Sequence, residues 1–317
     1  MSKCLMIVGM HRSGTSLLSS ILQKAGLFIG EELMEAGIAN KKGHFENIDF
    51  YNFQAKVFKS LSLDTDGWDL QTISTLNEEF DKEAEAIILK NNKAEWGWKE
   101  PRTTLFLNYW ANKIPSIKYV FVYRDPWDVA DSLYRRSSDP KIIANPIHAL
   151  DAWNFYNQEI IKMYKKNMDD SILIHIDDIT KDTASFVKSI NSKLGFHLNP
   201  NVVGDIFDKS LYKESNENLF YKRLTALAFP TLIDTLNELN TLANKPTFHT
   251  EILSPDQMSK EMTNQFISGW QELYIQKKEI KLLGIELDNQ KRELAWIKNT
   301  KYWKIRLFVR KLMGKKS

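Results

Sequence analysis

From residue 4 to residue 194, short continuous runs of apolar residues alternate with segments in which apolar residues recur at helical spacing. Apolar stretches at 4–8, within 95–102, and at 117–123 and 171–176 predict buried strands. Between and after them, apolar residues three and four positions apart predict helices, at residues 15–25, 50–61, 78–90, 149–166 and 180–194. This alternation predicts an α/β fold with a doubly wound parallel sheet.

The last part of the chain follows a different pattern. Residues 258–296 contain almost no Gly or Pro, and apolar or amide residues recur there at alternating spacings of three and four, namely Ile280, Leu283, Leu287, Gln290, Leu294 and Ile297. This heptad spacing predicts an amphipathic helix, which either forms a coiled coil in a homo-oligomer or docks on its own domain. We therefore expect an α/β domain at 1–250 and a helical extension at 251–317.

Charge is distributed unevenly along the chain. The net charge is +3, yet eight basic and no acidic residues lie from Lys298 onward, so the remainder is net acidic. Drawn as a helix, residues 299–313 place Trp303, Ile305 and Phe308 among these cations. This composition favours contact of residues 299–317 with an anionic membrane surface, although folding back onto the acidic body is an alternative. A net acidic body disfavours nucleic acid as a partner.

The amino-acid composition indicates the solubility and the cellular compartment of the protein. A hydrophobic content of 43% with nine tryptophans is sufficient for a packed core. The single cysteine, Cys4, cannot form an internal disulfide, which suits a reducing compartment. We see no secretory signal and no apolar stretch of roughly 18 residues. We expect a soluble, cytoplasmic protein, with the tail at the inner face of the membrane.

The first predicted strand leads into a polar loop with two glycines, Gly9 and Gly14. Glycines in such a loop let backbone N–H groups surround an anion at the start of the following helix, and phosphate is the obvious ligand. The spacing is that of a Walker A loop, but Thr15 replaces the lysine that reaches the outer phosphates. The nearby cation is Arg12, inside the loop, which argues against ATP.

A second phosphate site is indicated after the strand at 117–123. Arg124 lies at the carboxyl end of this strand, and Asp125-Pro126 begins a helix. Ser132 follows eight residues after Arg124, about two turns into that helix. The guanidinium of Arg124 and the hydroxyl of Ser132 can therefore bind one phosphate together.

These two motifs resemble those of the sulfotransferases that use PAPS, 3′-phosphoadenosine 5′-phosphosulfate, over roughly residues 1–215. The resemblance implies PAPS as cofactor, PAP as product and no metal. It assigns the 5′-phosphosulfate to Arg12, Ser13, Gly14, Thr15 and Ser16. It assigns the 3′-phosphate to Arg124 and Ser132. The acceptor is expected to carry a hydroxyl, on a carbohydrate or cell-surface glycan as in bacterial members.

The resemblance also suggests catalytic groups. Arg12 holds the transferred group, and Lys99 is placed like the family lysine that neutralises the leaving oxygen. Some members carry their base as a histidine two residues after that lysine, where this chain has Pro101. Other branches use a glutamate or histidine in the loop after the first helix. Our candidates for the base are therefore Glu46 first, His44 second and Glu100 third.

Two other functions remain open at this stage. One is a P-loop kinase or nucleotidase, which the missing lysine disfavours. The other is a nucleotide-binding scaffold that assembles through its C-terminal helix. A scaffold would keep the phosphate motifs without a working base, so turnover after Glu46→Gln and His44→Ala distinguishes it from an enzyme.

Overall fold

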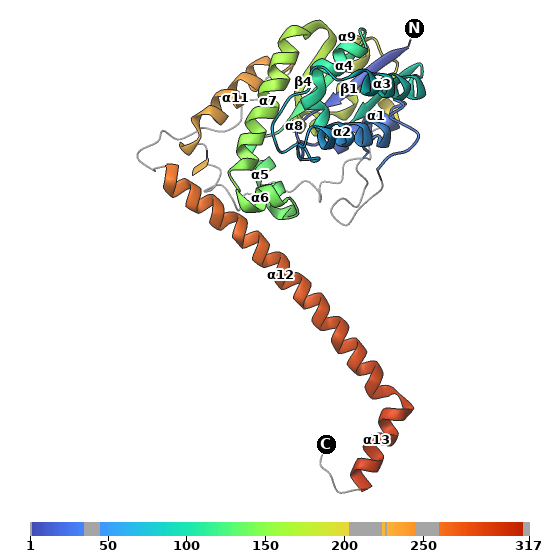
Figure 1. Ribbon diagram of the computed structural model, residues 1–317, viewed down its shortest axis with the longest axis vertical. Coiled ribbons are helices and arrows are strands. Elements are labelled where there is room, and N and C mark those ends of the chain that lie inside the picture. The colour runs from blue at the N-terminus through green and yellow to red at the C-terminus, as the bar shows by residue number, and fades with distance from the viewer. Residues whose placement is uncertain (1, 35–44, 203–223, 226, 245–259, 313–317) are drawn as a thin grey trace. The chain divides into compact units, whose positions relative to one another are not determined.

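A computed structural model of the protein describes residues 2–34, 45–202, 224–225, 227–244 and 260–312 (Figure 1). The chain divides into two compact units, Met1–Ser268 and Gly269–Ser317. The first unit contains the parallel sheet and the helices that pack on it. The second unit is helical.

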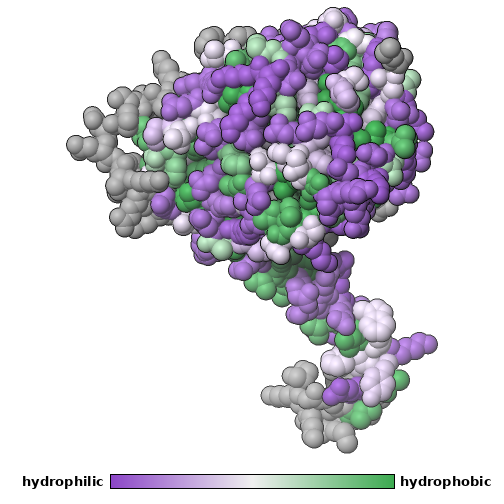
Figure 2. Space-filling model, turned by 45° about the horizontal axis from the view of Figure 1, so that its top comes forward, coloured by the Kyte–Doolittle hydropathy of each residue, from purple (hydrophilic) through white to green (hydrophobic). Residues whose placement is uncertain are grey.

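The second unit contains most of the long helix α12, Lys260–Asn299, and the shorter α13, Lys301–Leu312. Thr300 separates them, and its hydroxyl accepts a hydrogen bond from the N–H of Trp303 at 3.3 Å. Hydrophobic and hydrophilic surfaces lie side by side along this part of the chain in Figure 2. Within the described ranges, no helix is long and apolar enough to cross a membrane.

The sheet has four parallel strands in the order β2-β1-β3-β4. Their bounds are Lys3–Val8 for β1, Glu95–Lys99 for β2, Lys118–Tyr123 for β3 and Ser171–His175 for β4. Because β1 lies between β2 and β3, the segments that follow these three strands emerge side by side at one edge of the sheet. This is the edge at which doubly wound folds bind ligands. The predicted fold class is confirmed.

Helices connect and cover the strands. Their bounds are α1 Thr15–Lys24, α2 Ile48–Ser60, α3 Glu78–Asn91, α4 Leu107–Lys113, α5 Pro126–Arg136, α6 Pro140–Ala144, α7 His148–Lys166, α8 Ile176–Lys181, α9 Thr183–Leu194 and α11 Pro230–Leu242. The described residues also contain three short 3₁₀ helices, η1 Pro101–Phe106, η2 Met168–Asp170 and η3 Pro200–Val202.

One predicted helix was wrong in extent. The helix expected over 180–194 is divided into α8 and α9, because Asp182 leaves the helical conformation at φ −149°. Its carboxylate accepts a hydrogen bond from the N–H of Ser185 at 2.9 Å and so begins a new helix. The strand expected to reach residue 176 ends at His175, whose Nδ1 accepts a hydrogen bond from the N–H of Asp177 at 3.3 Å and so caps α8.

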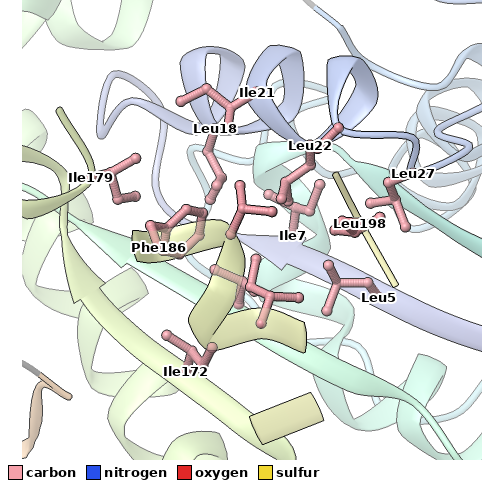
Figure 3. Packing of buried hydrophobic residues seen from close by; sticks show 14 of the residues in the cluster. Leu5, Ile7, Leu18, Ile21, Leu22, Leu27, Ile172, Ile179, Phe186 and Leu198 are labelled. Atoms are coloured by element: carbon pink, nitrogen blue, oxygen red, sulfur yellow. The ribbon is translucent and has the colours of Figure 1, made fainter. Parts of the chain in front are cut away.

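One face of the sheet is covered by aliphatic side chains. Leu5 and Ile7 of β1 pack beneath Leu18 and Leu22 of α1, and Phe186 of α9 lies in the same cluster (Figure 3). These side chains are at most 1% exposed. Burying them removes apolar surface from water, which stabilises the fold by about 25 cal/mol per Å².

The opposite face is aromatic. Trp98 of β2 stacks on Phe50 of α2, with ring centroids 4.1 Å apart, and Trp110 of α4 closes the cluster. On β3, Phe121 meets Tyr164 of α7 edge to face at 6.3 Å. Side chains alternate between the two faces of a strand, so this division follows from the sequence of each strand.

A glycine in β2 allows the two neighbouring strands to approach. A Cβ at Gly97 would lie 2.1 Å from the backbone oxygen of Leu5 in β1. We expect Gly97→Ala to lower the free energy of unfolding by about 2 kcal/mol or more, measured by urea denaturation. Gly269→Ala is the control, because nothing lies within 4 Å of its Cβ. Equal stability of both variants would contradict this packing.

Candidate functional site

The loop after β1 is tightly constrained. A Cβ at Gly9 would lie 2.6 Å from the backbone oxygen of Val122 in β3, so glycine is required there. Arg12 and Gly14 both have left-handed backbone angles, with φ of 67° and 93°. Gly14 is also the N-cap of α1, and no side chain caps this helix. The first N–H groups of α1 are therefore disposed to bind an anion.

Arg12 joins the two predicted phosphate motifs. Its Nε donates a hydrogen bond to Oγ of Ser132 in α5 at 2.8 Å. The sequence predicted that Arg124 and Ser132 would act together, and the structure shows Ser132 bonded to Arg12. The Arg124 backbone carbonyl accepts a hydrogen bond from the indole of Trp153 at 2.8 Å, which holds the end of β3 in place.

Four arginines create a strongly positive site. Burial, together with the charges of Arg136, Arg124 and Arg135, lowers the pKa of Arg12 to about 10, whereas Asp139 acts in the opposite direction. Sequence reasoning missed Arg135 and Arg136. They follow Ser132 by three and four residues on α5, a spacing that places them on its side of the helix. That spacing was the available signal.

Lys99 connects α1 to the carboxylate of Glu46. It ends β2 and is 1% exposed. Its Nζ donates to Oε1 of Glu46 at 2.9 Å and to Oγ of Ser16 at 3.2 Å. Burial lowers the pKa of Lys99, and the nearby Glu46 partly offsets that effect. The structure thus brings together three predicted residues. His44, the second candidate base, lies outside the described residues.

Glu100 is buried beside the same lysine. Its Oε1 accepts a hydrogen bond from Nε of Arg102 at 2.8 Å. Its Oε2 is buried and has no hydrogen-bond partner among the described residues. Burial raises the pKa of Glu100 to about 7, although the cation of Arg102 opposes this. The guanidinium of Arg102 also lies 4.2 Å from the ring centre of Tyr51, which orients it.

His11 is a further residue that sequence reasoning did not select. Its ring lies 4.9 Å from that of Trp68 and 6.1 Å from that of Tyr156. Burial lowers the pKa of His11, and the charges of Arg102 and other nearby cations lower it further. A neutral His11 adds no charge to the loop, so Arg12 supplies the cation there. The position of His11 between the two loop glycines was the only sequence signal.

The fold and this site define an α/β protein with a cluster of buried charges beside its sheet. A strand-loop-helix junction, an arginine cluster and a buried lysine-carboxylate pair meet at the carboxyl edge of a parallel sheet. A sequence model of the Sulfotransferase family matches residues 5–200. The chain therefore belongs to the sulfotransferase family, and the match includes every site residue described above.

The chain is also similar to several solved structures. A sulfotransferase from Alicyclobacillus acidocaldarius is 16% identical, with a TM-score of 0.48 over 77% of this chain and 97% of that chain. The sulfotransferase domain of the Synechococcus PCC 7002 olefin synthase is 17% identical, with a TM-score of 0.43 over 76% and 94%. Retinol dehydratase in complex with retinol and PAP is 13% identical, with a TM-score of 0.35 over 86% and 81%. No curated protein matches in sequence.

The raised pKa of Glu100 predicts a pH-dependent stability. Between pH 4.5 and about 7 the unfolded chain loses the Glu100 proton while the folded protein keeps it. The stability from this group is therefore complete below pH 4.5 and is lost as the pH rises to about 7. Glu100→Gln does not titrate at this position. Relative to that variant, the free energy of unfolding of wild type should fall by on the order of 3 kcal/mol between pH 4.5 and about 7.

Urea denaturation of both proteins at pH 4.5, 6 and 7.5 measures this difference. Glu78→Gln is the control, because Glu78 lies on the surface with its side chain 83% exposed. A constant difference between wild type and Glu100→Gln at all three pH values would contradict the raised pKa.

Proposed function

We propose that this protein transfers the sulfuryl group of PAPS to a hydroxyl acceptor, and that the acceptor is a carbohydrate or cell-surface glycan. The observation that carries the proposal is the 2.8 Å hydrogen bond between Arg12 and Ser132. It joins the loop after β1 to the helix after β3. This contact supports a single binding site built from the two motifs that each predict a phosphate ligand.

The residues fit a doubly phosphorylated nucleotide. The 5′-phosphosulfate would be held by the loop and the first turn of α1, namely Arg12, Ser13, Gly14, Thr15 and Ser16. The 3′-phosphate would be held by Arg124 and Ser132. Ser13 Oγ is buried and has no hydrogen-bond partner among the described residues, which leaves it available to an anion. Arg136, Arg124 and Arg135 each act with burial to lower the pKa of Arg12, so an anion bound among these cations would relieve their repulsion.

PAPS supplies an activated sulfuryl group and a good leaving group when it is bound. The protein must then hold the nucleotide, neutralise charge on the leaving oxygen and remove the proton of the acceptor. Lys99 is suited to the second task because its ammonium bonds to Ser16, at the start of α1. Arg12 is suited to stabilising charge on the transferred group.

Glu46 is our first choice for the base. In its ionised form it can accept the proton of the acceptor hydroxyl, while its bond to Lys99 keeps the carboxylate in place. Glu46 is 9% exposed, whereas Glu100 is 1% exposed and bonded to Arg102. A catalytic base must be reached by the acceptor hydroxyl, and the greater exposed fraction of Glu46 favours it over Glu100. Glu100, with a pKa of about 7, remains the alternative within the described part of the site.

The glycan acceptor rests on the resemblance to bacterial sulfotransferases. Most described tryptophans are core residues, including Trp96, Trp98, Trp110 and Trp153, so they are not available for stacking on sugars. A cytoplasmic location, with residues 299–317 touching the inner face of the membrane, belongs to the same proposal. No group of three or more His, Cys, Asp and Glu in the described ranges is placed to hold a metal ion.

Arg124 should discriminate between nucleotides by their 3′-phosphate. We expect PAP to bind in the micromolar range and Arg124→Ala to weaken its binding by about 2 kcal/mol or more, measured by calorimetry. AMP lacks the 3′-phosphate, so its affinity should not change. Lys162→Ala, on the exposed surface of α7, is the control. Equal losses for PAP and AMP would refute the assignment of Arg124.

Glu46→Gln should separate catalysis from binding. If Glu46 takes the acceptor proton, kcat should fall by roughly 10² to 10⁴ while the affinity for PAP stays near wild type. An acceptor screen with PAPS, followed by single-turnover kinetics, measures both. Glu32→Gln is the matched control, since Glu32 is exposed in the same segment. Unchanged turnover would move the role to His44 or Glu100, and wild-type PAP binding without any turnover would favour the scaffold.

A further inference from the structure

α12 carries a narrow stripe of apolar side chains exposed to solvent. In heptad notation, positions a are Leu273, Ile280, Leu287 and Leu294, and positions d are Gln276, Leu283, Gln290 and Ile297. The apolar members are between 36% and 69% exposed. A stripe formed by the a and d positions has the width of a coiled-coil seam, narrower than the face of a helix that docks on a globular domain.

Opposite charges border the two edges of this stripe. Positions g, before each a, are Glu272, Glu279, Glu286 and Glu293. Positions e, after each d, are Lys277, Gly284, Lys291 and Lys298. One edge is thus entirely acidic, and the other is basic at three of its four positions. All eight residues are exposed.

This charge pattern selects an orientation for two copies of α12. In a parallel, in-register pair, each g residue faces the e residue five positions later on the second copy. Glu272 then meets the Lys277 of the second copy, and the next two such pairs are Glu286 with Lys291 and Glu293 with Lys298. An antiparallel pair would instead place Glu against Glu and Lys against Lys, which is unfavourable.

We propose that the protein is a homodimer held by a parallel, in-register, two-stranded coiled coil of α12. The occupant of the apolar stripe is therefore the same stripe of a second copy. This inference concerns the second unit and does not depend on the reaction proposed for the first. The charge complementarity of the two edges carries it.

Two glutamines in the stripe favour the in-register pair over a shift of one heptad. In the in-register pair, Gln276 lies opposite Gln276 of the second chain, and Gln290 lies opposite Gln290. Two amides placed in this way can hydrogen-bond to one another. Each already donates one N–H to a glutamate of its own helix, Glu272 at 3.1 Å and Glu286 at 3.2 Å. The carbonyl oxygen and the second N–H remain for the partner amide. A shift of one heptad would place Gln276 against Leu283 and bury an amide without a partner.

The amides also favour two strands over more. Positions a and d are enclosed more completely as helices are added, and half of the d positions here are polar. Other exposed apolar residues, Leu282, Ile285 and Trp296, fall at positions c and f, outside the seam. They lack the acidic and basic borders, so we expect them to stay exposed in the dimer.

The first experiment measures the mass of the full-length protein by sedimentation equilibrium. We expect twice the chain mass of 36.9 kDa. The double variant Ile280→Asp/Leu287→Asp places charges in the seam and should weaken dimerisation at least a hundredfold. The matched control, Leu282→Asp/Ile285→Asp, changes residues that are 56% and 51% exposed on the same helix but outside the seam, and should remain dimeric. Urea denaturation checks that the first unit is unaffected.

The second experiment tests orientation through disulfide crosslinking. Gln276→Cys and Ile297→Cys are made separately in the full-length protein. These d positions are 21 residues apart, or about 31 Å along a helix. In a parallel, in-register pair, each introduced cysteine lies opposite the same cysteine of the second chain, so both variants form crosslinked dimers. In an antiparallel pair, at most one of the two positions can lie opposite the same position of the second chain. Wild type is the control, because its only cysteine, Cys4, is buried.

Several outcomes would overturn the proposal. A monomeric wild type at about 100 µM would do so, as would a mass of three or more chains. Equal dissociation of the seam variant and its control would show that heptad position is irrelevant. Crosslinks that form only between a Gln276→Cys chain and an Ile297→Cys chain would show an antiparallel pair.

Discussion

The site depends on positive charges held close together. Arg12 lies within electrostatic reach of Arg124, Arg135 and Arg136, and its pKa is lowered first by burial and then by repulsion from these cations. Like charges this close destabilise a protein unless an anion or a carboxylate compensates them. Asp131 partly compensates Arg135, through a 2.8 Å ion pair. A cluster of cations favours the approach of a polyanion to this edge of the sheet before any contact is formed.

The end of β2 separates two carboxylates that would otherwise compete for one cation. Lys99 and Glu100 are consecutive, so their side chains leave the strand in different directions. Lys99 meets Glu46 and Ser16, whereas Glu100 meets Arg102. Each carboxylate therefore has its own cation in a nearly dry environment. The two remain coupled, because the charge of Glu46 helps to raise the pKa of Glu100. A change at either carboxylate will be felt at the other.

Sequence alone predicted the parts of this site better than their connections. The strands, the loop at Gly9–Gly14 and the Arg124–Ser132 junction follow from local patterns, because apolar runs and turn glycines encode them directly. The bond between Arg12 and Ser132 does not, since it depends on β1 and β3 being neighbours in the sheet. The same holds for His11, whose aromatic neighbours come from distant segments. The division between α8 and α9 was missed because a single capping carboxylate, Asp182, determines it.

The parallel direction inferred for α12 has a consequence for the residues that follow it. Two parallel helices end on the same side, so the two copies of α13 leave the pair together. Each α13 carries exposed Tyr302 and Ile305 among basic residues. If one copy touches an anionic bilayer, the second is held at a high effective concentration above the same lipids. Two individually weak contacts then act as one bivalent anchor, and membrane residence becomes steeply dependent on the protein concentration that sets dimer formation.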